Sequence, residues 1–512
     1  MTLPYLTDDC IFYILQHLKN NHSTLFNCLL VNRFWCKSTI PLLYANPFMN
    51  ITKKNYSITM TLIFCFNKEE ILQLKNKLEQ NHINNINLDE EYKPLFEYTK
   101  YLENYNYFTI GSIINGYCLG LLIPYNKVYD ITLIFHQSIL RQSKNIKQLV
   151  ISTYLFNRES AKNFNVQNFI SNLTKLNSLS LILNDTSNNK INQEFLNNMA
   201  TNNLQELMID FFNNSVNNTT FEKLCTIIQE QNKLKKFKIL NCHSLLNNIL
   251  LSLEFQKNSL VHIEFINSNF SNVSLKNFNN LYNLKYLRFI TCKGILLDQC
   301  EILKFAPFKL KELSFASNNW DADVTSLMIK YLGASLQRLL IRSPTILSIE
   351  NISIYCSNLI FLKILIDTRF NCSVLPFFRN LRTRILNFSI FTSLTYNTEL
   401  FINLSKNIPI NISKISISYH NSYKYLRFKE FLENCHNKFE IINLNHTVEL
   451  NFLKIVLNYI ERSNNSLKIL GLINFNERLN DEESMLLNSI KAKGIKIMEF
   501  HNLNDVCEGL EA

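Results

Sequence analysis

One short apolar pattern returns fourteen times between residues 146 and 500. In each copy an apolar residue is followed three and five positions later by two more, and neighbouring copies start 23 to 30 residues apart. A repeat of this length is too small to bury an apolar face alone, so successive copies must stack on one another. The copies open at Ile146, Leu176, Leu204, Leu234, Leu260, Leu284, Leu310, Leu336, Leu359, Ile385, Ile412, Phe439, Leu467 and Ile495.

The spacing inside the pattern predicts a strand in every copy. The second and third apolar residues are two apart, so both point to one side of a strand, and the residues beside them point to the other. Some connecting segments have helical patterns, such as one that Asp323 would cap and one that opens at Asp481. An L-x-x-L-x-L core at this period is typical of leucine-rich repeats. We therefore expect an α/β fold, a leucine-rich-repeat solenoid shaped as a horseshoe, with a parallel inner sheet and helices on the convex side.

The patterns divide the chain into three parts. Residues 1–46, here called the head, carry short apolar helical patterns and predict a small all-α domain. Residues 47–140 form a transition segment, which one interpretation assigns to irregular first repeats. Residues 141–512 hold the leucine-rich-repeat array of about 14 repeats. No low-complexity linker separates the parts, so we expect no long flexible tether between them.

The chain is basic, with 52 Lys and Arg against 41 Asp and Glu and a net charge of +11. Such a balance can indicate acidic partners, nucleic acid included. A second interpretation is compositional drift, because Asn, Lys, Ile and Tyr are all abundant and no run of five basic residues occurs. We favour the second interpretation, so nucleic acid is not an expected partner.

Cysteine usage and hydropathy indicate an intracellular protein. The thirteen cysteines are odd in number and form no C-x-x-C pair, and many lie among apolar residues, as reduced thiols do. The start of the chain lacks the basic and apolar stretches of a secretory signal, and no apolar run reaches membrane-spanning length. We expect a cytoplasmic or nuclear location, or both, and no membrane partner.

Sequence patterns that carry catalysis or bind cofactors are missing. No G-x-G-x-x-G, P-loop, H-E-x-x-H, G-x-S-x-G or EF-hand pattern occurs, and only eight glycines are available for phosphate-binding loops. The ten histidines are dispersed, and no cysteines have the spacing of a zinc site. We therefore predict that the protein is not an enzyme and has no catalytic residue, metal site or cofactor.

The strand residues that point away from the core form a candidate binding surface on the concave side. Basic and aromatic residues outnumber acids there from the fourth repeat to the eleventh, with Glu264 and Glu312 as the acids. One interpretation is a site for an acidic or phosphorylated peptide, and the other is a set of solvated side chains in a Lys-rich protein. The predicted substrate-binding residues are Lys236, Lys238, Tyr286, Arg288, Arg338, Arg342, Phe361 and Lys363, and Lys414 lies at an equivalent position.

The head carries a Leu-Pro start, an apolar helical stripe and a V-x-x-x-W element. These features resemble the F-box motif, and F-box proteins commonly carry an array of leucine-rich repeats. The resemblance covers under a tenth of the chain and implies that the head binds a Skp-type adaptor. A unit of about 45 residues buries its own core poorly, so its apolar residues must cover a partner, the array or both; a plain terminal cap is the alternative. The predicted adaptor-binding residues are Leu3, Pro4, Ile11, Ile14, Leu15, Leu18, Val31 and Trp35.

The resemblance implies a substrate-recognition subunit of a cullin-RING (SCF-type) ubiquitin ligase. Its adaptor would connect it to a cullin, and its repeats would recruit a protein substrate. Such a subunit breaks no bond itself and acts by raising the effective concentration of a substrate near the conjugating enzyme. Two alternatives stay open: a ligase-independent interaction scaffold, and a less favoured nucleic-acid-binding solenoid that uses the basic concave face. We expect no homo-oligomer.

Overall fold

The structure is a computed structural model of the chain. It describes residues 7–48, 57–79, 94–123, 125–156, 164–183, 190–199, 203–212, 216–368, 370–391, 398–419, 424–474 and 479–500. The chain forms two compact units, Met1–Cys242 and His243–Ala512.

The first unit begins with a head of three helices, α1 (Asp8–His17), α2 (His22–Cys28) and α3 (Arg33–Leu43). Asparagine side chains cap the N-termini of the second and third helices. Asn21 accepts from the backbone N–H of Thr24 at 3.1 Å, and Asn32 accepts from that of Trp35 at 3.0 Å. The helices share a small core, whose buried residues are Ile11, Leu15, Leu25, Cys28 and Leu42.

Helices also occupy the stretch between the head and the repeats. They are α4 (Ser57–Ile63), α5 (Lys68–Glu79), α6 (Tyr107–Gly120) and α7 (Tyr125–Gln142), with the 3-10 turn η1 (Tyr98–Tyr101) before α6. Helix α5 packs on α7, where Glu70 accepts two hydrogen bonds from Arg141 at 2.7 and 2.8 Å. Because this contact is bidentate, it fixes the direction as well as the distance between the two side chains.

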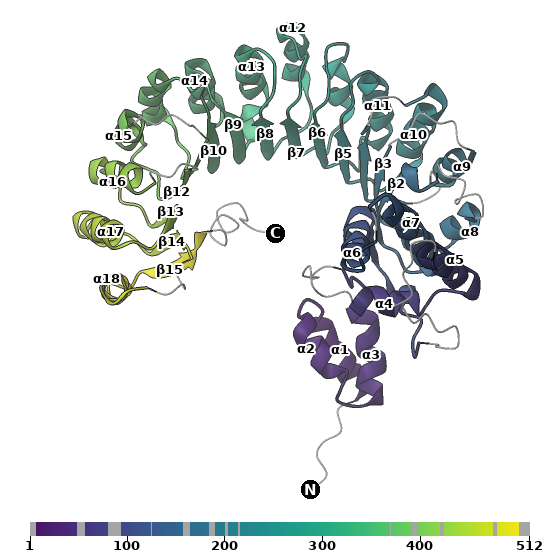
Figure 1. Cartoon of the computed structure of the whole chain (residues 1–512). Coiled ribbons are helices and arrows are strands. Elements are labelled where there is room, and N and C mark those ends of the chain that lie inside the picture. The colour runs from purple at the N-terminus through teal and green to yellow at the C-terminus, as the bar shows by residue number, and fades with distance from the viewer. Residues whose placement is uncertain are drawn as a thin grey trace. The chain divides into compact units, whose positions relative to one another are not determined.

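The strands of the first unit run parallel and pair in chain order. They are β1 (Asn104–Asn106), β2 (Gln148–Ser152), β3 (Ser178–Ile182), β4 (Glu206–Asp210) and β5 (Lys236–Leu240). The connections contain η2 (Thr153–Phe156), α8 (Val166–Ser171), α9 (Lys190–Met199) and α10 (Asn218–Glu230). Helices α8 to α10 all lie on one side of these strands (Figure 1). A chain that returns on the same side after every strand builds a solenoid.

The second unit continues the same construction. Its parallel strands are β6 (His262–Ile266), β7 (Tyr286–Ile290), β8 (Glu312–Ala316), β9 (Arg338–Arg342), β10 (Phe361–Ile366), β11 (Ile385–Ile390), β12 (Lys414–Tyr419), β13 (Ile441–Thr447), β14 (Ile469–Ile473) and β15 (Lys496–Glu499). Its helices are α11 (Leu246–Leu253), α12 (Leu297–Cys300), α13 (Ala322–Leu332), α14 (Ile346–Tyr355), α15 (Thr398–Asn407), α16 (Lys424–Asn434), α17 (Leu450–Arg462) and α18 (Asp481–Ala492). The 3-10 turns are η4 (Glu254–Gln256), η5 (Leu275–Asn280), η6 (Glu301–Phe305), η7 (Gly333–Ser335) and η8 (Cys372–Asn380). These helices line one face of the strands, and the opposite face is here called the inner face (Figure 1).

Aromatic stacking joins successive repeats in the core of the second unit. The rings of Phe265, Phe289 and Phe315 follow one another on β6, β7 and β8, with centroids 5.6 and 5.9 Å apart and planes within 15°. Leu287, two residues before Phe289, is also buried. The two-residue alternation of a strand sends both side chains toward the helices and their neighbours to the inner face.

Backbone hydrogen bonds extend the ladder from one repeat to the next. The carbonyl of Lys285, just before β7, accepts from the N–H groups of Lys311 and Glu312 at 2.8 and 3.0 Å. The carbonyl of Lys311 accepts in the same way from Gln337 and Arg338, at 2.9 Å each. Because each repeat offers one carbonyl to two donors of the next, every strand starts at a fixed place relative to its neighbour.

This architecture confirms the predicted α/β solenoid, with parallel strands and with helices along one side. Twelve copies of the sequence pattern have a strand that begins two residues after the opening residue. The tenth copy is wrong in register. Leu386 lies opposite Leu362, so this copy opens at Thr383 and not at Ile385.

The fourteenth copy is also displaced, by one residue. Ile497 lies opposite Leu470, where the pattern predicts Met498. In the observed registers Thr383 takes the opening position of the tenth copy, and Gly494 and Glu499 take the first and last positions of the fourteenth. These residues do not fit the apolar pattern, so the hydrogen-bonded pairing with the preceding strand sets a register that the pattern alone does not find.

Candidate functional site

Three charged side chains meet on the inner face of β7, β8 and β9. Glu312 accepts from Nε of Arg288 at 2.8 Å on one carboxylate oxygen, and from Nε of Arg338 at 3.2 Å on the other. The Glu312 side chain is only 12% exposed, whereas that of Arg288 remains 39% exposed. The shared carboxylate orients both guanidinium groups. Nη2 of Arg288 also lies 2.6 Å from Oε1 of Glu312.

A second ion pair lies at the end of β9. Arg342 donates from Nε to Oδ2 of Asp367 at 2.8 Å and also contacts the hydroxyl of Ser317. Ser343 donates to Oδ1 of the same carboxylate at 2.5 Å. The buried Asp367 carboxylate therefore has a charged and a neutral partner, which offset the cost of its removal from water.

The inner face of β6 to β10 is consequently less basic than the concave surface that the sequence predicts. Basic and acidic side chains nearly balance on these strands and the residue after them. The basic ones are Arg288, Arg338, Arg342 and Lys363, and the acidic ones are Glu264, Glu312 and Asp367. Asp367 was missed in the sequence because it lies one residue beyond β10, outside the repeated pattern.

The aromatic residues predicted on this face are partly covered. The Arg338 guanidinium lies 4.8 Å from the ring centre of Phe361, and Phe361 is only 3% exposed. Tyr286 is half-buried and stacks on His262 with ring centres 5.7 Å apart. Phe361 thus acts as a platform for Arg338, and Tyr286 stays half-exposed beside His262.

Two of the predicted basic residues belong to the first unit. Lys236 and Lys238 lie on β5, with Lys236 exposed and Lys238 half-buried. Nζ of Lys236 lies 2.6 Å from Oε1 of Glu206 on the neighbouring strand β4. Both side chains of this pair are well exposed, so the pair contributes at most about 1 kcal/mol to stability.

The predicted adaptor-binding residues of the head divide between its core and its surface. Ile11 and Leu15 are buried in the core of the three helices, and Leu18 and Trp35 pack against that core. Ile14 and Val31 are exposed, at 39% and 58%. Leu3 and Pro4 lie outside the described residues.

Further apolar residues of the head are exposed that the helical stripe did not identify. Phe12 and Tyr13 lie on α1, Phe26 lies on α2, and Leu30, at 80% exposed, lies in the turn that follows α2. The prediction relied on apolar residues that recur at helical spacing. These residues are instead apolar at positions where helical spacing predicts a solvent-exposed side chain. The described part of the head therefore leaves several large apolar side chains exposed.

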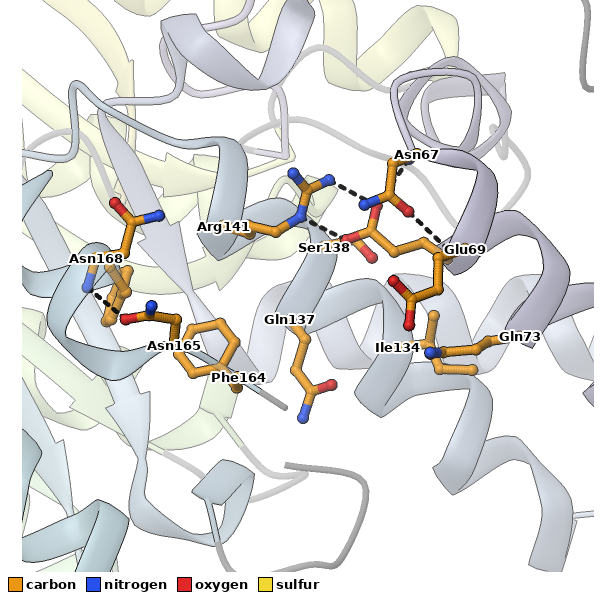
Figure 2. A pocket seen from close by; sticks show the side chains of 12 residues that line it. Asn67, Glu69, Gln73, Ile134, Gln137, Ser138, Arg141, Phe164, Asn165 and Asn168 are labelled. Carbon is orange, nitrogen blue, oxygen red and sulfur yellow. Dashed lines mark hydrogen bonds and ion pairs between the residues drawn. The ribbon is translucent and has the colours of Figure 1, made fainter. Parts of the chain in front are cut away.

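A small pocket lies between α5, α7 and the start of α8 (Figure 2). Its volume is about 170 Å³, and Arg141, held by Glu70, forms part of its wall. Nε2 of Gln137 and Oγ of Ser138 are shielded there without a hydrogen-bond partner in the described part of the chain. This volume is well below the roughly 300–1,000 Å³ of small-molecule sites, so we assign the pocket no ligand.

The titratable groups with the most displaced pKa values are buried and not poised for catalysis. Burial raises the pKa of the thiols of Cys118, Cys300 and Cys356 to about 12, which keeps them protonated and unreactive. Burial lowers the pKa of His136 to about 3, and its Nδ1 is hydrogen-bonded to the Tyr105 hydroxyl at 2.7 Å. His136 is therefore a neutral core residue at physiological pH.

Within the described residues, no three or more His, Cys, Asp and Glu side chains gather closely enough to hold a metal ion. None of the helices that the structure describes has the length and apolar character needed to cross a bilayer.

No protein-family model and no curated protein matches the chain. Among solved structures it is similar to a chain of the Rad7 and Elc1 complex in yeast, with 12% identity, a TM-score of 0.32, and coverage of 98% of this chain and 100% of that one. An internalin from Listeria monocytogenes has 16% identity and a TM-score of 0.30 over 70% of this chain and 88% of that one. The TLR13–ssRNA13 complex has 16% identity and a TM-score of 0.34, over 65% of this chain and less than half, 44%, of that one. Similarity this low places the chain in no family and assigns it no partner.

Proposed function

We propose that the chain is the substrate-recognition subunit of a cullin-RING ubiquitin ligase. In this proposal residues 1–46 bind a Skp-type adaptor, and the repeats at 141–512 bind a protein substrate. Residues 47–140 connect the head to the repeats. The chain itself performs no bond chemistry. It holds a substrate lysine near the conjugating enzyme, so that an encounter between two molecules becomes one within a complex.

The observation that carries the proposal is the division of apolar residues in the head. Ile11 and Leu15 already fill the small core, so the exposed Phe12, Phe26 and Leu30 serve no packing purpose within the head. Fully burying one such side chain contributes about 1.5–3 kcal/mol, so several on one partner give stable binding. A small helical domain of this kind, with the sequence features of an F-box, fits an apolar groove on an adaptor.

The inner face of the second unit supports the substrate-binding half of the proposal. Glu312 holds Arg288 and Arg338 in fixed directions, and fixed guanidiniums lose less entropy when they bind a carboxylate or phosphate. The near balance of charge disfavours nucleic acid, which needs many uncompensated cations along its path. A protein segment with a few acidic or phosphorylated residues suits this face better.

The adaptor-binding half is tested with the full-length chain and a purified Skp-type adaptor. Leu30→Asp places a charge on the exposed turn of the head and should reduce co-purification of the adaptor by at least about tenfold. Leu347→Asp is the matched control, because Leu347 is exposed on α14 in the second unit. It should leave adaptor recovery unchanged.

Two results would count against the proposal. If the Leu30→Asp variant recovers as much adaptor as the wild type, the exposed surface of the head around Leu30 does not bind the adaptor. Failure of the wild-type chain to bind any Skp-type adaptor would favour a ligase-independent scaffold. If the adaptor binds but no bound protein becomes ubiquitinated in a reconstituted ligase, only the adaptor-binding half stands.

A further inference from the structure

In the second unit, exposed lysines lie on the turns that lead into β6, β7, β8 and β9. These turns are residues 254–261, 279–285, 303–311 and 330–337, here called the turn surface. They contain six lysines and one acid, Glu254. All six lysines are exposed, and none has an ion pair within the described part of the chain. They are Lys257, Lys285, Lys304, Lys309, Lys311 and Lys330.

The turns at the other ends of the same strands have the opposite charge balance. They are residues 267–275, 291–301, 317–324 and 343–350, and they contain a single lysine. Their acids are Asp298, Glu301, Asp321, Asp323 and Glu350. Helix dipoles favour acids at helix N-termini and lysines at C-termini, which accounts for the direction of this separation. The positive charge of these repeats is therefore concentrated on the turn surface.

Aromatic rings lie among the lysines of the turn surface, and helix dipoles do not account for them. Phe255 and Phe305 are 67% and 64% exposed, and Tyr282, on the turn between theirs, is 51% exposed. Tyr331 is half-buried on the fourth turn. Nζ of Lys304 lies 4.8 Å from the ring centre of Phe305, so charge and ring are adjacent. Each of the four turns thus has one of these rings and at least one exposed lysine.

Backbone hydrogen bonds hold the four turns in chain order. The carbonyl of Val261 accepts from the N–H groups of Lys285 and Tyr286 at 2.9 and 3.0 Å, and the carbonyl of Lys285 accepts from those of Lys311 and Glu312. Neighbouring strands lie about 4.8 Å apart, so the turns present their rings and charges in succession. Because each of these carbonyls already has two donors, a ligand of the turn surface must contact the side chains.

We propose that the turn surface binds single-stranded nucleic acid. The lysines pair with its phosphates, and the rings of Phe255, Tyr282 and Phe305 stack on its bases. Stacking of this kind tolerates any sequence, because every base has a flat face. No arginine lies in the four turns. Lysine binds a phosphate as a point charge, whereas arginine has the planar fork that matches a carboxylate, so an acidic protein segment fits this surface less well.

The turn surface is distinct from the inner face, where Arg288, Arg338 and Arg342 are paired with acids. Its proposed ligand does not depend on the ligase proposal. Composition disfavours a nucleic-acid partner because the sequence has no run of five basic residues. The fold instead gathers lysines from four separate turns, which a search for consecutive basic residues does not find.

The test uses the full-length chain and fluorescein-labelled oligonucleotides of about twelve thymidines or uridines, with binding followed by fluorescence polarisation. Between about 50 and 200 mM salt, the slope of log Kd against log salt should be about 3 to 4, as expected for about five phosphate contacts. Lys285→Gln with Lys311→Gln should weaken binding by at least about tenfold and lower this slope by about 1.4. Lys454→Gln with Lys491→Gln removes the same charge from exposed positions on α17 and α18 and should have little effect.

Variants of the rings separate stacking from attraction of charge alone. Phe255→Leu with Phe305→Leu should weaken binding by about tenfold or more and leave the salt slope unchanged. Phe212→Leu is the matched control, because Phe212 is 62% exposed in the first unit. It should bind as the wild type does.

Three results would overturn the proposal. The first is that neither oligonucleotide binds. The second is that the ring variant binds as the wild type does and double-stranded DNA binds equally well, because attraction of charge alone would then explain the binding. The third is that a peptide of alternating Glu and Leu binds more tightly than the oligonucleotides and loses affinity with the two lysines, which would assign the turn surface to an acidic protein segment.

Discussion

The guanidinium of Arg338 lies 4.8 Å from the ring centre of Phe361, which belongs to the next strand. The same guanidinium donates to Glu312 on the preceding strand at 3.2 Å. Arg338 therefore joins three successive repeats on the inner face. Its cation–π contact and its ion pair both restrict the side chain, which makes it part of the scaffold as well as a candidate binding group.

The carboxylate of Glu312 should matter more for stability than an exposed ion pair. Glu312→Gln leaves Arg288 and Arg338 without their shared charge, so we expect the free energy of unfolding to fall by about 1–3 kcal/mol. Lys236→Gln breaks the exposed pair with Glu206 and should cost less than about 1 kcal/mol. Urea unfolding of both variants measures the difference. Equal losses would show that Glu312 is not a structural centre of the inner face.

Core and surface leucines of the second unit should differ sharply in tolerance to charge. Leu287 is 1% exposed between stacked repeats, so Leu287→Asp buries a carboxylate with no partner and should cost more than about 4 kcal/mol. The same change at the exposed Leu347 should cost under about 0.5 kcal/mol. Thermal unfolding followed by circular dichroism compares the two. An unchanged melting temperature for Leu287→Asp would contradict the assignment of this residue to the core.

Acid should weaken the first unit through His136. Its pKa is lowered from 6.5 to about 3 by burial, beside the rings of Tyr105 and Tyr107. Because the folded pKa lies below the unfolded one, protons favour the unfolded chain. The stabilising contribution is complete above about pH 6.5 and is lost as the pH falls toward 3, by at most about 1.4 kcal/mol per pH unit.

His136→Gln provides the control for this pH dependence. Glutamine cannot take up a proton, so the variant should lose less stability between pH 6.5 and 4 than the wild type does, whatever its stability at pH 7. Unfolding midpoints across this range measure both slopes. Parallel slopes would show that other groups, such as carboxylates, account for the acid sensitivity.

Most of the fold could be predicted because its determinants are local and repeated. The alternation in each copy fixes which side chains face the core, and the regular period fixes that the strands stack in chain order. The exact residue at which a helix begins is harder to predict, because several nearby side chains can cap the helix N-terminus. Asp323 is the predicted cap of α13, but Asp321 fills that role and accepts from the N–H of Asp323 at 3.0 Å. Either residue could cap in isolation, and the turn after β8 decides between them.

The interaction surfaces could be predicted only in part, because partners in this fold come from different repeats. Arg288 and Glu312 are 24 residues apart in sequence, and their contact depends on the register between β7 and β8. The sequence shows the charges but not that they neutralise each other. In the head, the helical stripe led to Ile11 and Leu15, which form the core, whereas exposed residues such as Leu30 follow no periodic pattern.

Removal of the positive charge of Arg288 tests whether this side chain binds substrate. Arg288→Glu is less suitable, because it would place a second carboxylate beside Glu312. Arg288→Gln leaves Glu312 paired with Arg338, so the fold should persist while one exposed guanidinium is lost. Capture of acidic or phosphorylated proteins by the full-length chain, measured by affinity purification and mass spectrometry, should fall by about three- to tenfold. Arg288→Lys keeps the charge but not the planar fork and should restore part of the capture. Lys304→Gln removes a charge from the exposed end of η6 and should have no effect. Equal capture by Arg288→Gln and Lys304→Gln would remove Arg288 from the substrate-binding surface.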